Sequence, residues 1–204
     1  MNYYHDLITQ ESWKELKTLN KEITFVLIGG WATYLYTKEL KSKDIDMLVE
    51  YGELGKLKKE YDVVKNERLK KYEARRGGVQ IDMYLPHFSS IGIPVEVLMN
   101  NSRSLEGFRV LEREWLMCLK IYVLGVRGRT PKGEKDFLDI LSLFKTKTYD
   151  AWKLKTILKT YNFGTCIDVF SQLLSERTHA LEIGLNDHFY KKLKVDIVSF
   201  IKCL

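Results

Sequence analysis

The chain contains few cysteines and few histidines, and their spacing excludes two classes of site. Cys118, Cys166 and Cys203 lie far apart among 204 residues. Such spacing gives neither a disulfide framework nor a zinc site, so we expect three buried thiols. The four histidines form no recognisable ligand set or catalytic triad. We therefore assign no catalytic role to histidine.

Long apolar runs are also absent. No stretch approaches the roughly 20 apolar residues that cross a bilayer, and the polar N-terminus lacks the apolar core of a signal peptide. A composition of 45% hydrophobic and 29% charged residues is typical of a soluble globular protein and excludes a disordered chain. We predict a cytoplasmic protein without a membrane partner.

Acidic residues are outnumbered by basic ones. The formal net charge is +6 and the isoelectric point is near 9.0. A basic surface attracts polyanions such as nucleic acids and nucleotides over long range. This charge would suit an RNA substrate.

The most informative stretch joins an apolar run to two glycines and then to two acids. The run ends at Gly29 and Gly30, a predicted helix follows, and Asp44 and Asp46 then stand at the head of a second strand-like run. Carboxylates at i and i+2 of a strand share one face. At about 4 Å they repel by about 4 kcal/mol for an effective dielectric near 20, so they need a proton, a cation or a metal ion between them. Oxygen ligands of this kind favour Mg²⁺ or Mn²⁺, which bring substrate phosphates.

Four further residues extend this predicted metal and phosphate site. Gly29 and Gly30 let the backbone approach phosphates closely, at the start of a helix whose amides face them. Ser42 adds a hydroxyl. Asp82 lies on the polar face of an alternating strand predicted at residues 79–85. We predict that Asp82 lies beside the first two acids.

Lysine and arginine are concentrated between residues 65 and 76, where only Glu67 and Glu73 balance them. Arg75 and Arg76 are nearest in sequence to the predicted acidic site. The segment is either a solvated edge that its charges protect from aggregation or a contact for nucleic acid or a triphosphate. The sequence leaves both open.

The pattern changes after Leu111. Almost every later segment has helical periodicity, and no linker rich in glycine or serine marks a boundary. We predict an α/β domain at residues 1–111 with a mixed sheet of about five strands. A helical bundle at residues 112–204 would pack tightly on it and shape the acceptor site.

Two predicted helices of this second part carry charged residues. The helix at residues 112–126 is apolar nearly all round, so Lys120 is conspicuous. It aligns within about 40° with Arg113 and Arg127, and it either reaches solvent or contacts phosphates. The next helix, which starts at a threonine cap and a proline, carries Asp136 and Asp139 on one side. These acids form either ordinary surface ion pairs or part of a site.

Together these motifs resemble the nucleotidyltransferase fold of the polymerase-beta superfamily, over roughly residues 20 to 145. The helical part is similar to AbiEii-type toxin nucleotidyltransferases. The residues that carry the resemblance are Gly29-Gly30, Ser42-x-Asp44-x-Asp46, Asp82, Lys120, Arg127 and Lys135-Asp136-x-x-Asp139.

The resemblance implies an α+β fold, a nucleotidyltransferase-like mixed sheet with flanking helices followed by a C-terminal helical bundle. It also implies a metal-dependent enzyme that moves a nucleoside monophosphate from a nucleoside triphosphate to an acceptor hydroxyl. Asp44 and Asp46 would hold Mg²⁺ or Mn²⁺, and Asp82 would bind a second metal ion and help to activate the hydroxyl.

The remaining implied roles concern the nucleotide and the acceptor. Gly29, Gly30 and Ser42 would cradle the phosphates. Lys120 and Arg127 would neutralise charge on the leaving group. Asp136, in preference to Asp139, would be a general base or an anchor for Lys120.

The acceptor would be RNA, such as a tRNA end, or a protein hydroxyl. In a toxin, a cognate antitoxin would be the partner. Two alternatives stay open: a module that binds nucleotide or RNA without turnover, and a transferase whose acceptor is a small molecule such as an aminoglycoside.

Overall fold

The computed structural model describes residues 2–204, with side chains from residue 6 onward. The chain forms two compact units, Met1–Glu112 and Arg113–Leu204. The sequence placed this boundary after residue 111, and the packing of the second unit on the first stays a prediction. None of the helices in the described part of the chain combines the length and the apolar character that a bilayer crossing requires.

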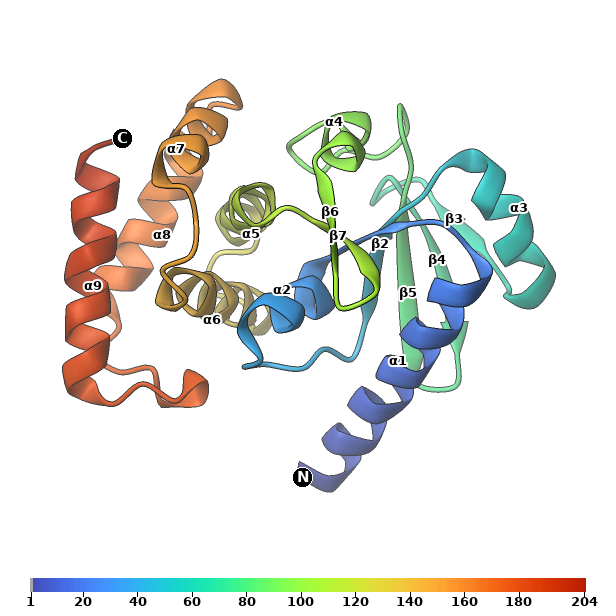
Figure 1. Ribbon diagram of the computed structural model, residues 1–204, viewed down its shortest axis with the longest axis horizontal. Helices are drawn as coiled ribbons and strands as arrows, with labels where there is room; N and C mark the ends of the chain where they lie inside the picture. The colour runs from blue at the N-terminus through green and yellow to red at the C-terminus, as the bar shows by residue number, and fades with distance from the viewer. Residues whose placement is uncertain (1) are drawn as a thin grey trace. The chain divides into compact units, whose positions relative to one another are not determined.

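In the described part of the first unit, seven strands form one mixed sheet with helices around it (Figure 1). The strand order is β3-β4-β5-β2-β1-β7-β6. The elements in chain order are α1 (Asn2–Glu22), β1 (Val26–Ile28), α2 (Gly29–Thr37), β2 (Ile45–Leu48), α3 (Tyr51–Glu60), β3 (Val64–Asn66), β4 (Lys71–Arg76), β5 (Val79–Tyr84), α4 (Val95–Asn100), β6 (Ser102–Leu105) and β7 (Phe108–Leu111).

The apolar sequence of β1 explains why this strand lies in the interior of the sheet. All three residues of β1 are buried, and β1 pairs with β2 in antiparallel and with β7 in parallel orientation. A short strand with neighbours on both sides and apolar residues throughout is typical of a sheet interior. β2 pairs in parallel with β5, and α1 packs against β5. The predicted α+β fold with a mixed sheet is confirmed.

The sheet is larger than the five strands that the sequence predicted. The sequence predicts one extended run at residues 105–111, but the structure has a hairpin there, in which β6 and β7 pair in antiparallel orientation. Its turn contains Glu106 and Gly107, both with positive φ. Only glycine adopts that conformation at little cost, so a glutamate at the first turn position concealed the turn.

The sequence Ser12-Trp-Lys-Glu15 has the form of a capping box and predicts that the first helix starts there. This prediction is wrong, because α1 extends on both sides of Ser12. Its hydroxyl is buried and accepts a hydrogen bond from the Trp31 indole at 2.8 Å. A tertiary partner therefore explains the serine better than a local cap does.

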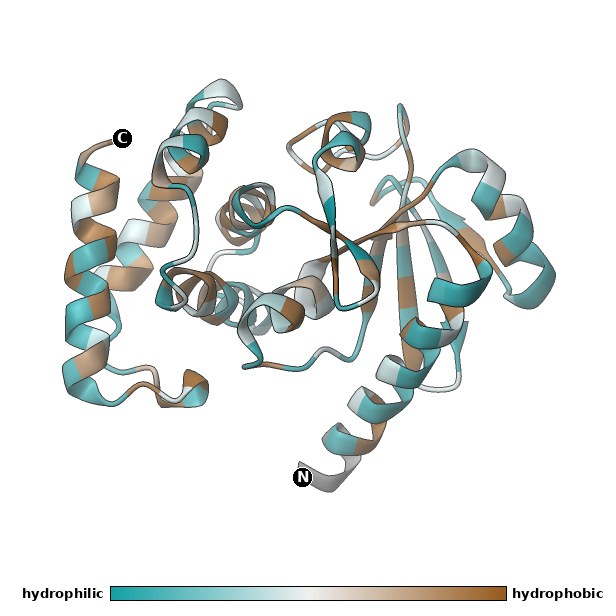
Figure 2. Ribbon diagram, in the orientation of Figure 1, coloured by the Kyte–Doolittle hydropathy of each residue, from teal (hydrophilic) through white to brown (hydrophobic). Residues whose placement is uncertain are grey.

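The second unit is helical, as predicted. Figure 2 shows hydrophilic and hydrophobic residues alternating along α9, whose buried side chains are Tyr190, Leu193, Ile197 and Phe200. The helices are α5 (Arg113–Arg127), α6 (Pro131–Lys145), α7 (Ala151–Thr160), α8 (Gly164–Glu176), the 3-10 helix η1 (Leu181–Ile183) and α9 (Asp187–Lys202).

The sequence predicts helix caps at Thr130, Asp150 and Asn186, and three helices begin there. The side chains of Thr130, Asp150 and Asn186 each accept hydrogen bonds from backbone amides of the first turn of their helix. These bonds satisfy amides that have no partner within the helix. The caps confirm where α6, α7 and α9 start.

The expectation of three buried thiols is only partly right. Cys118 is buried, and burial raises the pKa of its thiol well above the usual value. Cys166 is half-buried and Cys203 is exposed. Cys203 lies beyond the last buried turn of α9, where apolar sequence alone did not reveal its exposure.

Candidate active site

Strand register brings two of the three predicted acids together. The parallel pairing of β2 and β5 makes Asp46 the direct partner of Asp82. Paired residues on neighbouring strands point to the same face, so both carboxylates project from one face of the sheet. The pairing of β4 and β5 adds Glu73, the partner of Asp82 on its other side. We call the side of the sheet that carries Asp46, Asp82 and Glu73 the acid face.

Asp44 immediately precedes β2, and Ser42 lies two residues earlier. Asp44 and Asp46 are half-buried, whereas Ser42 is buried. The chain therefore presents two carboxylates and a hydroxyl within five residues.

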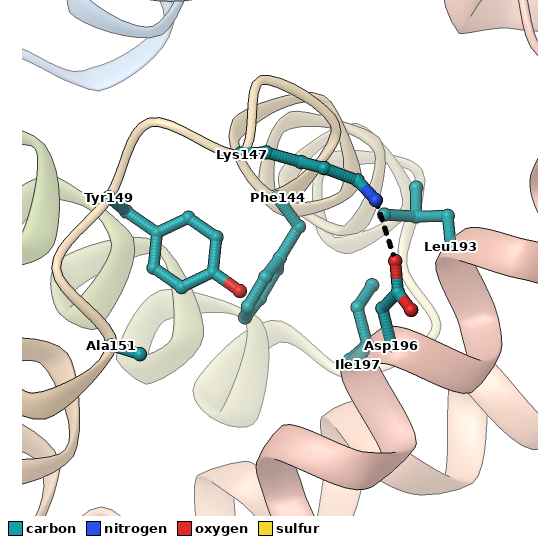
Figure 3. A pocket seen from close by; sticks show the side chains of 7 residues that line it. All are labelled: Phe144, Lys147, Tyr149, Ala151, Leu193, Asp196 and Ile197. Atoms are coloured by element: carbon teal, nitrogen blue, oxygen red, sulfur yellow. Dashed lines mark hydrogen bonds and ion pairs between the residues drawn. The ribbon is translucent and has the colours of Figure 1, made fainter.

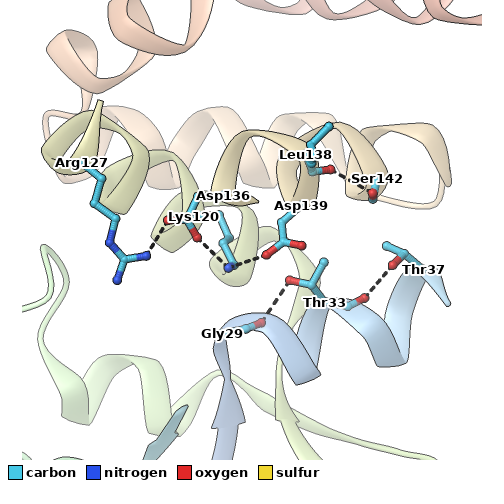
Figure 4. A network of polar contacts seen from close by, with 9 residues as sticks. All are labelled: Gly29, Thr33, Thr37, Lys120, Arg127, Asp136, Leu138, Asp139 and Ser142. Atoms are coloured by element: carbon cyan, nitrogen blue, oxygen red, sulfur yellow. Dashed lines mark hydrogen bonds and ion pairs between the residues drawn. The ribbon is translucent and has the colours of Figure 1, made fainter. Parts of the chain in front are cut away.

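Gly29 adjoins the carboxylate of Asp46. It opens α2 with a φ of +67°, a conformation that favours glycine. A Cβ placed there would lie 2.1 Å from Oδ2 of Asp46. Any side chain at this position would therefore displace the acid. The Asp46 carboxylate lies against the start of α2, where Gly30 is the second residue. Thr33 donates a hydrogen bond to the Gly29 carbonyl (Figure 4).

Asp82 is held by neighbouring strands. Lys71 donates to Oδ2 of Asp82 at 2.6 Å, and the Gln80 amide donates to Oδ1 at 2.8 Å. Lys71 also pairs with Oε1 of Glu73 at 2.8 Å, and the Asn66 amide donates to the other Glu73 oxygen at 3.1 Å. One ammonium thus bridges two carboxylates of the acid face.

Charges on the acid face shift the pKa values of this group. Burial disfavours the charged form of Lys71, but Asp82 and Glu73 outweigh burial, so the pKa of Lys71 is raised. The bonds from Lys71 and Asn66 lower the pKa of Glu73. Lys71 is therefore a cation and Glu73 an anion at neutral pH.

The predicted metal can be tested against these residues. Mg²⁺ binds through one or two carboxylates and substrate phosphates. Asp46 offers such oxygens against Gly29, and Asp44 stands two residues before it in the chain. Within residues 6–204, no group of three or more His, Cys, Asp or Glu side chains is arranged to hold a metal ion. The first two acids fit a divalent cation, and Asp82 is occupied by Lys71.

The two arginines at the end of β4 have different surroundings. Arg75 is exposed and shares the acid face, because it lies two residues from Glu73 and pairs with Gln80. Arg76 points to the opposite face, where it contacts Glu15 of α1 at 3.3 Å and the Tyr61 hydroxyl at 3.4 Å. Arg75 is therefore the hairpin arginine that faces the acids.

A second charged cluster lies inside the helical unit, between α5 and α6 (Figure 4). The Lys120 ammonium contacts Oδ1 of Asp136 at 2.8 Å and Oδ2 of Asp139 at 2.6 Å. Arg127 contacts the second Asp136 oxygen at 2.6 Å. We call Lys120, Arg127, Asp136 and Asp139 the helical cluster. Surface ion pairs do not describe it, because Lys120 and both acids are buried.

Burial and pairing compete within the helical cluster. For Lys120, burial opposes the charge but the two carboxylates dominate, and the pKa is raised. For Asp136, Lys120 and Arg127 overcome burial and lower the pKa. For Asp139, burial dominates and raises the pKa. One Asp139 oxygen is buried and lacks a hydrogen-bond partner in the described part of the chain.

The helical unit also contains a cavity of about 270 Å³ (Figure 3). Phe144, Leu193 and Ile197 supply apolar walls, and Tyr149 adds a phenol. Lys147 and Asp196 pair there at 2.9 Å. None of the residues that the sequence assigned to a site lines this cavity.

Sequence reasoning missed Lys71, Glu73 and Gln80. A signal was present, because Gly77 and Gly78 form a two-residue turn that fixes the pairing of β4 with β5. That register places Glu73 opposite Asp82 and sets Lys71 on the same face. The net charge of the hairpin does not reveal this register.

Three-dimensional similarity to solved structures was found. No protein-family model matches the chain, and a search of curated proteins returned no significant match. An antigenic nucleotidyltransferase-like protein from Paracoccidioides brasiliensis is 16% identical, with 97% of this chain and 93% of that chain covered and a TM-score of 0.52. ANT(2'')-Ia in complex with adenylyl-2''-tobramycin is 15% identical, with coverages of 76% and 96% and a TM-score of 0.55.

The Megavirus polyadenylate synthase is 14% identical, with 70% of this chain and 32% of that chain covered and a TM-score of 0.50. At such identities the similarity concerns the fold. The chain therefore has the nucleotidyltransferase fold that the sequence predicted. The AbiEii-type toxin assignment stays a prediction.

Proposed function

We propose that the chain is a metal-dependent nucleotidyltransferase that moves a nucleoside monophosphate from a nucleoside triphosphate to an acceptor hydroxyl. The register that sets Asp46 beside Asp82 supports this best. The glycine cradle against Asp46 and the fold agree with it. The paired acids and the glycines lie on β2, β5 and the start of α2.

Asp44 and Asp46 would hold a Mg²⁺ or Mn²⁺ ion, which when bound neutralises triphosphate charge. Gly29 and Gly30 would offer backbone amides to the phosphates, and Ser42 its hydroxyl. The acceptor oxygen would attack the α-phosphorus and give up its proton to Asp82, the bond from that phosphorus to its bridging oxygen would break, and pyrophosphate would leave. We assign Asp82 to orienting the acceptor hydroxyl beside Asp46.

For the helical unit we propose a supporting role in nucleotide binding. Arg127 has a side chain that is 40% exposed, so it can offer a guanidinium group to phosphates. Lys120 would contribute indirectly, because it pairs with Asp136, the carboxylate that also holds Arg127. Asp136 has a lowered pKa, which disfavours proton abstraction, so we assign it to anchoring Lys120 rather than to general base catalysis.

For the acceptor we propose RNA, such as a tRNA end. The net charge of +6 and the exposed Arg75 on the acid face favour a polyanion. A small-molecule acceptor is the second candidate, because ANT(2'')-Ia, which has a similar fold, was solved in complex with adenylyl-2''-tobramycin.

A toxin role, with a cognate antitoxin as partner, predicts growth arrest on expression of the chain but not of its Asp44→Asn variant.

Nucleotide transfer tests the proposal directly. The purified chain is incubated with Mg²⁺ and each α-labelled nucleoside triphosphate in turn, with total RNA, an aminoglycoside or the protein alone as acceptor. We expect label on RNA. The Asp44→Asn variant should lower the rate by about 100-fold or more, the scale for losing a preorganised charged group.

An exposed acid of the same unit supplies the matched control. Asp62→Asn removes one exposed negative charge from the segment before β3 and should leave the rate unchanged. Label on the aminoglycoside alone would move the assignment to the second candidate. Triphosphate binding without label on any acceptor would favour a binding module instead of an enzyme.

A further inference from the structure

Lys71 lies inside a row of carboxylates. The register of β4, β5 and β2 aligns Glu73, Asp82 and Asp46 on three adjacent strands. Neighbouring strands are about 4.8 Å apart, so three anions in such a row repel strongly unless cations separate them. Lys71 separates the first two, with its side chain only 9% exposed.

The contacts of Lys71 belong to the sheet itself. Its ammonium reaches Asp82 at 2.6 Å and Glu73 at 2.8 Å, and Gln80 occupies the remaining Asp82 oxygen. All four residues stand on β4 and β5. Strands that pair along five residues hold these groups more rigidly than a loop would. A lysine that merely reached for solvent would not be buried between two acids.

We infer that Lys71 takes the place of a second divalent cation at Asp82. This inference rests on the proposed function. The ammonium compensates the Asp82 carboxylate and fixes its direction, so Asp82 is not a metal ligand and the site holds one divalent ion, at Asp44 and Asp46. Lys71 is a positioning residue, because it acts through Asp82.

A fixed ammonium differs from a bound metal ion in one respect. A metal ion exchanges its water ligands for substrate oxygens, whereas a lysine held by two carboxylates offers no such exchange. Asp82 therefore meets the acceptor as an oriented carboxylate. The single metal ion serves the triphosphate.

Metal stoichiometry tests the inference without any turnover. Mn²⁺ alone is titrated into the full chain, and electron paramagnetic resonance counts the ions that remain free. We expect one bound ion per wild-type chain, none for Asp44→Asn, and a second ion for Lys71→Met, which leaves Asp82 and Glu73 uncompensated. The control Lys65→Met removes an exposed lysine of the neighbouring strand and should bind one ion.

A second variant keeps the test valid if Lys71→Met does not fold. Asp82→Asn retains the contact of Lys71 with Glu73 and should bind one Mn²⁺ ion with a Kd within about twofold of the wild-type value. A Kd raised by about tenfold or more would identify Asp82 as a ligand and overturn the inference. Two ions in the wild-type chain would do the same.

The wild-type titration also separates the inference from the function on which it rests. No bound ion in the wild-type chain would remove the metal site at Asp44 and Asp46, and the inference would fall with it. One ion in the wild-type chain and an unchanged count in folded Lys71→Met would overturn the role of Lys71 alone. Nucleotide transfer then still tests the enzyme.

Discussion

Two lysines in this molecule are each held by two carboxylates, one on a sheet and one between helices. Lys71 bridges Asp82 and Glu73 on the acid face of the first unit, whereas Lys120 bridges two aspartates of α6 in the second. Both lysine side chains are 9% exposed. Their partners differ in burial and in charge balance.

The helical cluster is compensated and enclosed. Arg127 adds a second cation, so two positive groups face Asp136 and Asp139, whose side chains are 4% and 0% exposed. On the acid face one ammonium faces two carboxylates, which are 11% and 27% exposed, and Asp46 adjoins them. The same ion-pair motif is therefore enclosed and charge-balanced between the helices, whereas on the sheet it belongs to a more exposed row of carboxylates.

We expect the largest loss of stability when the helical cluster loses Lys120. Lys120→Met leaves two buried carboxylates without their shared cation, a change that costs about 3–5 kcal/mol of unfolding free energy. Urea denaturation at pH 7 measures this loss. The matched control is Lys132→Met, which removes an exposed lysine of α6. Its free energy of unfolding should lie within about 0.5 kcal/mol of the wild-type value.

The stability cost of removing Lys71 can be compared with the cost of removing Lys120. Lys71→Met should cost less, about 1–3 kcal/mol, because Glu73 and Asp82 have more access to water. A larger loss for Lys71 than for Lys120 would contradict the comparison. It would mean that the acid face is the more enclosed of the two groups.

The next effect concerns pH and distinguishes the two aspartates of the helical cluster. An ordinary aspartate has a pKa of about 3.9. Asp136 has a lowered folded-state pKa, so its stabilisation is present above about pH 4 and is lost as pH falls through the folded value. Asp139 has a raised folded-state pKa, so its contribution is present below about pH 4 and is lost as pH rises through the folded value.

Substitution should therefore give opposite slopes. Relative to wild type, the cost of Asp136→Asn should grow between pH 3 and pH 7, whereas the cost of Asp139→Asn should shrink over the same range. Urea midpoints at several pH values measure both. Parallel slopes would show that Lys120 and Arg127 stabilise the two carboxylates equally.

These two regions also show what could be predicted from sequence. Alternation in β5 predicted the polar face of Asp82, and the glycine pair predicted the turn into α2, because both signals are local. The contact of Lys71 with Asp82 was not predicted, because a lysine in a basic segment reads as solvated until strand register is known.

The same limit applies to other residues. Ser12 had the spacing of a cap but is a partner of Trp31 from another element. The i,i+3 spacing of Asp136 and Asp139 was visible, but their burial depends on how α5 packs against α6. Local spacing could be predicted from the sequence, whereas the contacts that tertiary packing creates could not.

The smallest effect concerns the acid face, which carries a basic side chain of its own. Arg75 is exposed there, with no hydrogen bond or ion pair among the residues that the structure describes, whereas Arg76 is tied to Glu15 and Tyr61 on the opposite face. Arg75→Ala should weaken binding of single-stranded RNA a few-fold and reduce the slope of log Kd against log salt by about 1, as expected for one lost phosphate contact. Fluorescence anisotropy at several salt concentrations measures both quantities.

The control variant Arg76→Ala removes the same charge and should leave the slope unchanged. Equal slopes in the two variants would mean that the hairpin attracts RNA through diffuse charge, and that the acid face has no phosphate contact at Arg75.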